Sequence, residues 1–274
     1  ASMIQLPLEK LGGMKVMTRI ESFLWLFLGG NSGIGKATAV DLARRGARVI
    51  LGCRNKARGE SAMYDIRRES GNSEVILMIL DLGNLNSVRA FAQTFLASEP
   101  RLDILINNAG VLKAGQTADG FDQAFQVNYL AHFLLTHLLL DRLKRCAPSR
   151  IVILSSIAHI CGKIDFQTMH KPGKVMQNAL HSYSNSKLAN LLHARELARR
   201  LEGTNVTCYA VHPGEWKSSS KAPQMEQPDP DIPLSPVVFT SFCSSVQNEH
   251  SCHCSSPGEH LSPCIVRIIF ILRY

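Results

Sequence analysis

The run FLWLFL at positions 23–28, followed directly by GGNSGIG at 29–35, decides the fold of this 274-residue chain. The apolar run predicts a strand, and residues 36–45 predict a helix that ends at Gly46. A glycine-rich turn between a strand and a helix is typical of a loop that binds a dinucleotide. Its glycines permit a tight turn, and the free N–H groups of the helix start attract a pyrophosphate. An ordinary strand-to-helix turn is the alternative. Gly29, Gly33 and Gly35 are the glycines expected to hold the pyrophosphate, and Asn31, Ser32 and Ile34 are further cofactor-binding candidates of the same loop.

The pattern of strand, helix and glycine then repeats along the chain. Further strands are predicted at 48–51, 75–80, 102–106 and 150–154 and after Gly203, and helices at 57–70, 85–98, 120–144 and 182–201. The strands are apolar without strict alternation, which indicates burial on both faces, as in a parallel sheet. The sequence therefore predicts an α/β protein with a doubly wound parallel sheet, the Rossmann fold.

Composition narrows the classes of partner. The chain is 45% hydrophobic and 19% charged, as in globular proteins, and its net charge is +8. The basic residues are spread over presumed outer helix faces with no block of five or more, so we expect a solvated basic surface and no nucleic-acid partner. Such a surface also favours phosphorylated cofactors or an anionic membrane. No run of about 18 apolar residues occurs, so no membrane-spanning helix is expected.

Residues at the ends of the predicted strands indicate which nucleotide binds. Arg54 follows the second strand, and no acidic residue occurs from 48 to 59, which favours NADP(H) over NAD(H). Lys36 beside the loop would assist, although two solvent-facing basic residues are the alternative. Asp81 follows the third strand, where its carboxylate can accept a hydrogen bond from the adenine amino group. The stretch at 107–110, NNAG, follows the fourth strand, where it would line the cofactor cleft or form a plain turn.

Tyr183 and Lys187 form the sharpest candidate catalytic pair. Four residues apart, they lie on one helix face, so we expect the ammonium to lower the pKa of the phenol from about 10 toward working pH. A phenol tuned in this way is a general acid or base. Ser156, after the strand at 150–154, would hydrogen-bond the substrate oxygen, with Ser155 as its rival. Asn128 is unusual inside a helix by propensity.

The order and spacing of the glycine loop, NNAG, Asn128, VILSS, YSNSK and VHPG resemble the short-chain dehydrogenase/reductase family from about residue 23 to residue 214. Within it, GCRNKARGE, RIVILSSIAH and HSYSNSKLANLLHARELARRLEG are most similar to the retinol dehydrogenase group. The resemblance implies that Tyr183 is the catalytic acid/base, with Ser156 orienting the substrate carbonyl. Lys187 would hold the nicotinamide ribose, and Asn128 would support a water that links Lys187 to solvent.

The resemblance also implies a full set of cofactor contacts. The glycines of the loop would bind the pyrophosphate and Arg54 the 2′-phosphate. Asp81 would bind the adenine, Asn108 the adenosine ribose region and Lys187 the nicotinamide ribose. The other residues expected to contact the cofactor are Leu82, Ala109, Gly110, Tyr183, Pro213 and Gly214.

The implied activity is an NADP(H)-dependent oxidoreductase that interconverts a lipophilic alcohol and its aldehyde or ketone, with a retinoid-like compound as one substrate. The alternative is a catalytically impaired chain that acts as a nucleotide-binding or interaction protein. The implied location is the cytoplasm or the surface of the endoplasmic reticulum membrane.

The chain departs from the family pattern at three places. Leu28 stands where the family usually has Thr, and the residues before 23 do not resemble the family's usual start. After Gly214 the family pattern stops: residues 215–274 hold 7 of the 12 prolines and read as an alternative carboxyl end. We therefore expect an N-terminal arm at 1–20, a dinucleotide-binding domain at 21–214 and an irregular tail at 215–274 in place of the last strand and substrate lid.

The tail leaves three smaller questions. Ser218 falls at the offset of the family's carboxamide-binding Thr, and residues 264–274 look strand-like enough to replace the missing edge strand. The tail's His and Cys residues lack the paired Cys-x-x-Cys spacing, so we expect no metal site.

Overall fold

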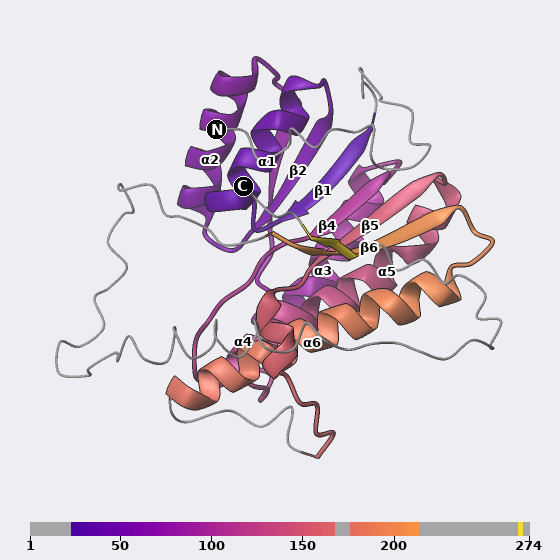
Figure 1. Ribbon diagram of the computed structural model, residues 1–274. Helices are drawn as coiled ribbons and strands as arrows, with labels where there is room; N and C mark the ends of the chain where they lie inside the picture. The colour runs from indigo at the N-terminus through magenta and orange to yellow at the C-terminus, as the bar shows by residue number, and fades with distance from the viewer. Residues whose placement is uncertain (1–22, 168–175, 214–267, 271–274) are drawn as a thin grey trace. The chain divides into compact units, whose positions relative to one another are not determined.

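The computed structural model describes residues 23–167, 176–213 and 268–270 (Figure 1). The strands are β1 (Leu24–Leu28), β2 (Arg48–Cys53), β3 (Val75–Ile79), β4 (Ile104–Asn107), β5 (Ser149–Leu154), β6 (Val206–His212) and β7 (Ile268–Phe270). The helices are α1 (Gly33–Arg44), α2 (Lys56–Ser70), α3 (Leu85–Ser98), α4 (Gln123–Phe125), α5 (Ala131–Arg145) and α6 (Met176–Arg200), with a π turn η2 (Gln126–Leu130) and a 3₁₀ turn η3 (Ile157–Cys161).

All strands pair in parallel in the order β3-β2-β1-β4-β5-β6-β7. From β1 the chain adds β2 and β3 on one side, then returns to add β4, β5 and β6 on the other. Helices α1 and α2 cover one face of the sheet, and α3, α5 and α6 cover the opposite face (Figure 1). The predicted doubly wound parallel sheet is therefore confirmed, and its switch point lies between β1 and β4.

The sheet is sandwiched between two apolar cores, which explains the continuous apolar strands. Leu24, Leu26 and Leu28 of β1 pack into the core with α3 and α5, whereas Phe27 packs into the core with α1. Alternate residues of one strand thus enter opposite cores. Burying both faces requires apolar side chains at nearly every position.

Two predicted elements differ in detail. The helix expected at 120–144 is interrupted, because α4 passes into the π turn η2 before α5 begins. A π turn adds a residue per turn and is frequent at functional sites, which periodicity alone does not reveal. The helix expected at 182–201 begins earlier, at Met176.

The last strand is one of the alternatives that the sequence left open. Residues Ile268–Phe270 form β7, which pairs in parallel with Ala210, Val211 and His212 of β6. Residues 268–270 therefore supply a short edge strand. The arm at 1–20, Gly214, Ser218 and the tail's His and Cys residues lie outside the described residues.

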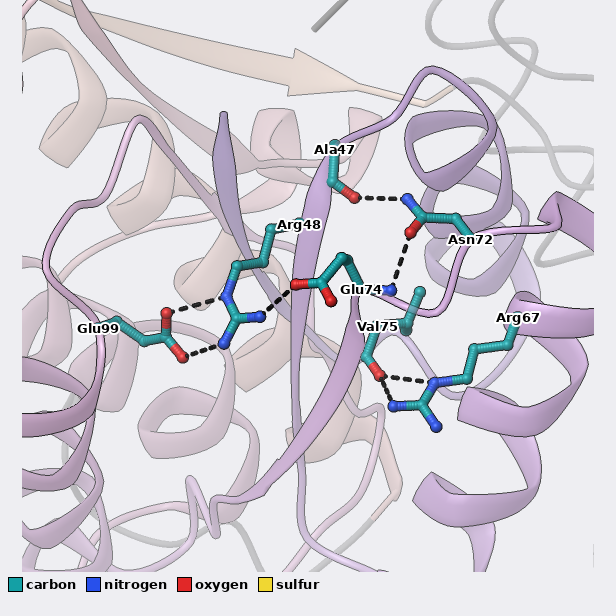
Figure 2. Close-up of polar contacts among 7 residues, drawn as sticks. All are labelled: Ala47, Arg48, Arg67, Asn72, Glu74, Val75 and Glu99. Carbon is teal, nitrogen blue, oxygen red and sulfur yellow. Dashed lines mark hydrogen bonds and ion pairs between the residues drawn. The ribbon is translucent and has the colours of Figure 1, made fainter. Parts of the chain in front are cut away.

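A polar network fastens the amino ends of β2 and β3, at the sheet edge opposite the glycine loop (Figure 2). The Arg48 guanidinium donates to both carboxylate oxygens of Glu99, at 3.0 and 2.8 Å, and to Glu74 at 2.6 Å. Burial leaves the Glu99 side chain 6% exposed, and the two carboxylates raise the pKa of Arg48. Nearby, Arg67 donates to the Val75 carbonyl and Asn72 to the Ala47 carbonyl.

Replacing Arg48 should therefore destabilise the fold. Arg48→Met leaves the buried Glu99 carboxylate without its bidentate partner, and we expect the free energy of unfolding to fall by about 2 kcal/mol. Arg89→Met, at an exposed arginine of α3, should change it by less than about 0.5 kcal/mol. Urea unfolding measures both variants, and equal effects would contradict a specific role for the Arg48–Glu99 pair.

Candidate active site

The glycine loop touches the segment that follows β4. Gly29 has φ +76°, and a Cβ at this position would lie 2.8 Å from the Ala109 Cα. A Cβ on Gly35 would overlap the Gly29 carbonyl and lie 2.8 Å from the Asn108 Nδ2 atom. Both positions therefore require glycine, one for its backbone conformation and one for space. Such a cradle of bare backbone at the start of α1 fits a pyrophosphate.

The Asn108 side chain connects the segment that follows β4 to the start of the glycine loop. Its amide nitrogen donates to the carbonyls of Leu28 and Gly29, each at 3.1 Å. Ser32 is the N-cap residue of α1, and its side chain makes no capping hydrogen bond. The predicted loop residues and the segment at 108–110 thus meet at the carboxyl edge of the sheet.

The residues expected at the adenosine end follow β2 and β3. Arg54 is exposed directly after Cys53, and Asn55 caps α2 by accepting from the Arg58 N–H at 2.9 Å. Asp81 forms a turn in which its Oδ1 atom accepts from the Gly83 N–H at 2.9 Å. Leu82 is buried beside it.

Lys36, which was expected to assist Arg54 in binding NADP(H), forms an ion pair within the protein. Its ammonium lies 2.6 Å from the carboxylate of Asp65 on α2, so an internal partner already engages the charge. This ion pair lowers the pKa of Asp65. The pairing leaves Arg54 as the basic residue at the end of β2 in the predicted NADP(H) set.

The candidate catalytic side chains come from α6 and from the N-cap of η3, which follows β5. The Tyr183 phenol hydrogen-bonds with the Ser156 hydroxyl. The Lys187 Nζ atom lies 5.5 Å from the centroid of the Tyr183 ring and donates to the Leu154 carbonyl at 3.1 Å. Ser155 instead donates to the Lys187 backbone carbonyl at 2.8 Å. The contacts therefore favour Ser156 over Ser155 as the hydroxyl beside the phenol.

The pKa shifts of this pair differ from the expectation. Burial raises the pKa of Tyr183, and the Ser156 hydrogen bond only partly opposes this effect. Burial lowers the pKa of Lys187 to about 8, because this residue is 4% exposed and its ammonium loses most of its hydration. The expected lowering of the phenol pKa by Lys187 is therefore wrong.

Asn128 lies in the π turn η2, and its side chain joins the segment that follows β4 to α6. Its Oδ1 atom accepts from the Val111 N–H at 2.7 Å, and its Nδ2 atom donates to the Val111 carbonyl at 2.9 Å and to Ser186 at 3.0 Å. A Cβ on Gly110 would lie 3.6 Å from both Asn128 Oδ1 and Lys187 Nζ. The sequence-predicted Asn128, Gly110 and Lys187 thus come together.

Two residues near this site were missed by sequence reasoning. Asn190 and His132 both contact the Asn128 carbonyl, Asn190 through its amide and His132 through Nδ1, each at 3.0 Å. The available signal was a pair of polar residues on the helix faces that otherwise carry apolar core positions. Pro213 follows β6 at the end of the described segment.

A doubly wound sheet with a glycine cradle at its switch point and a Tyr-x-x-x-Lys helix beside it defines a Rossmann-fold nucleotide-binding protein. A sequence model of the short chain dehydrogenase family matches residues 25–229, and the chain belongs to this family.

The chain is similar to several known members. It is 61% identical over 190 residues to dehydrogenase/reductase SDR family member 13 of Bos taurus, covering 69% of this chain and 50% of that protein. It is 56% identical over 188 residues to retinol dehydrogenase 12 of Mus musculus, covering 68% and 59%. Among solved structures, the Pseudomonas aeruginosa RhlG/NADP active-site complex matches with a TM-score of 0.60 and 26% identity, over 74% of this chain and 77% of that one. The chain thus spans about half the length of the curated relatives it matches.

The Ser156 contact predicts a measurable effect on Tyr183. Ser156→Ala removes a hydrogen bond that stabilises the phenolate, so the pKa of Tyr183 should rise further. Ser155→Ala removes a bond to backbone and should leave that titration unchanged. Ultraviolet difference titration against Tyr183→Phe isolates this phenol. A shift in the Ser155 variant with none in the Ser156 variant would reverse the assignment.

Proposed function

We propose that this chain is an NADP(H)-dependent oxidoreductase that interconverts a lipophilic alcohol and its aldehyde or ketone. The observation that carries the proposal is the Ser156–Tyr183–Lys187 arrangement beside the glycine cradle. A hydroxyl, a phenol and an ammonium at the carboxyl edge of a doubly wound sheet form a set suited to proton transfer at a carbonyl oxygen. We further propose residues 21–214 as the dinucleotide-binding domain.

The side chains of this chain would share the proton chemistry. The Tyr183 phenol transfers its proton to the carbonyl oxygen during reduction and takes it back during alcohol oxidation. Ser156, which already hydrogen-bonds the phenol, orients that oxygen. The Lys187 ammonium stabilises negative charge on the phenol and binds the nicotinamide ribose. The nicotinamide supplies or accepts the hydride.

Three observations support NADP(H) as the cofactor. Arg54 is exposed where β2 ends, and the first turn of α2 contains no acidic residue. A guanidinium and a helix amino end both favour the extra phosphate. The RhlG structure, which is similar to this chain, contains NADP.

The lipophilic substrate class is supported by exposed apolar residues on the segments that follow the site. Leu112 lies two residues beyond Gly110 and is 52% exposed, and Ile160 lies in the 3₁₀ turn after Ser156 and is 50% exposed. Phe166, 81% exposed, lies further along the same segment. Exposed apolar groups beside a polar site suit an apolar ligand or a membrane surface. The retinol dehydrogenase relatives support a retinoid-like substrate.

The proposed location is the cytoplasm or the periphery of the endoplasmic reticulum membrane. Within the described parts of the chain, each helix is too short or too polar to cross a bilayer.

Binding and turnover test the proposal separately. We expect NADPH fluorescence to change on titration with the protein and retinal to be reduced at the expense of NADPH. Tyr183→Phe should keep cofactor binding and lower turnover by about 10²-fold or more, because it removes the transferable proton. Tyr64→Phe, at an exposed tyrosine of α2, is the matched control. Binding without Tyr183-dependent turnover would instead support a nucleotide-binding or interaction protein.

Cofactor preference forms a second test. Arg54→Gln should weaken NADPH binding by about tenfold or more and leave NADH binding nearly unchanged, because only NADPH carries the 2′-phosphate. Lys36→Gln should leave the ratio of the two affinities unchanged, since Asp65 already engages Lys36. Equal losses for both cofactors in Arg54→Gln would contradict the assignment of Arg54 to that phosphate.

A further inference from the structure

The amide of Asn190 joins two backbone carbonyls behind the Tyr183–Lys187 pair. Its Nδ2 atom donates to the Asn128 carbonyl at 3.0 Å and to the Leu154 carbonyl at 3.1 Å. Because both partners can only accept, the nitrogen and not the oxygen of the amide must face them. The side chain is 1% exposed, so water does not compete for these bonds. Asn190 thereby links the end of β5 to the π turn η2.

Lys187 shares one of these carbonyls. Its ammonium donates to the same Leu154 oxygen, also at 3.1 Å. Lys187 and Asn190 are three residues apart and lie on one face of α6. The Leu154 carbonyl is the last of β5 and directly precedes Ser155 and Ser156. The position of this one oxygen therefore sets where the ammonium lies relative to the phenol.

His132 holds the other carbonyl. Its Nδ1 atom lies 3.0 Å from the Asn128 oxygen and must carry the proton, because a carbonyl only accepts. Burial lowers the pKa of His132 to about 3, so the ring is neutral at working pH. A neutral ring braces the carbonyl without placing a second positive charge beside Lys187.

Each of these two side chains has one buried acceptor without a partner in the described structure, the Asn190 Oδ1 atom and the His132 Nε2 atom. Leaving such an acceptor unpaired costs about 1–3 kcal/mol, and an apolar residue of similar shape would avoid that cost. Core packing alone therefore does not account for an asparagine and a histidine here. The donor groups of the two side chains account for their presence, because the Asn190 Nδ2 and His132 Nδ1 atoms are the ones that form hydrogen bonds.

We propose that Asn190 is a positioning residue for Lys187: its amide, braced by His132 through the Asn128 carbonyl, fixes the Leu154 oxygen that anchors the ammonium beside Tyr183. The inference rests on the proposed function, in which Lys187 acts on the phenol and the cofactor ribose. Asn190 itself touches neither substrate nor cofactor and acts through Lys187.

Asn190→Leu tests this role, because leucine keeps the approximate size and removes both donors. Without Asn190 the Leu154 oxygen no longer accepts from a second donor, so it can accept more strongly from the ammonium. This change favours the charged form, so the Lys187 titration should move upward from about 8 toward 10.5 by about one pH unit or more. The titratable groups that face the ammonium among the described residues are Tyr183 on α6 and His132 on α5, with His193 acting on His132.

The measurement is an NMR titration of protein labelled with ¹³C-lysine, in which Lys187→Arg assigns the signal. Asn185→Leu is the matched control, because Asn185 is also buried on α6 but accepts from the Lys163 N–H. Asn185→Leu should leave the Lys187 titration in place. Asn190→Ala, which also removes both donors and adds no charge, should move it upward and serves if Asn190→Leu does not fold.

Turnover provides the second reading. In Asn190→Leu we expect kcat to fall about tenfold or more while the KM for retinal stays within about threefold, because the substrate contacts are untouched. An unchanged Lys187 titration in folded Asn190 variants would overturn the proposal, even with a lowered melting temperature. If the unsubstituted protein lacks turnover while the titration still responds to Asn190→Leu, the proposed function fails and the positioning role stands.

Discussion

The close contact between the backbone after β1 and the backbone after β4 is the constraint on which the site depends. The sheet reverses its winding between these two strands, and doubly wound sheets bind their ligands at the carboxyl ends of the strands at this point. Gly29 and Gly35 allow the two segments to approach, and the Asn108 amide closes the approach by binding the Leu28 and Gly29 carbonyls. A side chain at either glycine would separate the loops and displace the start of α1. The cofactor cradle is thus a consequence of backbone packing before any ligand binds.

The second constraint on the site is burial, which sets the protonation states of Tyr183 and Lys187. Burial raises the pKa of the phenol and lowers that of the ammonium to about 8. Both groups are therefore driven toward their neutral forms. A protonated phenol is the form that can give a proton to a carbonyl oxygen. Spacing alone suggested the opposite shift, because it accounts for the nearby charge and not for the lost hydration.

The sequence could predict the fold and most of the site because both depend on local patterns. Continuous apolar strands ending in glycines implied a parallel sheet, and polar residues at strand ends had to meet at one edge. The π turn at Asn128 was not predictable, since one added residue hardly changes the hydrophobic periodicity around it. The pairing of Lys36 with Asp65 was also not predictable, because the two residues lie on different helices and are 29 residues apart in the sequence. Asn190 had an equally weak signal, since its partners are backbone atoms.

Asn128 shows why the cofactor side and the catalytic side of the site cannot move independently. Its side chain holds Val111 after the NNAG segment and Ser186 on α6, while its carbonyl accepts from Asn190 and from His132. Ser186 in turn donates to the Tyr183 carbonyl at 2.6 Å. A shift of the segment at 108–111 must therefore either break buried hydrogen bonds or carry α6 with it. Breaking them is costly because the groups are buried, so the position of the segment at 108–111 also sets that of the phenol and the ammonium.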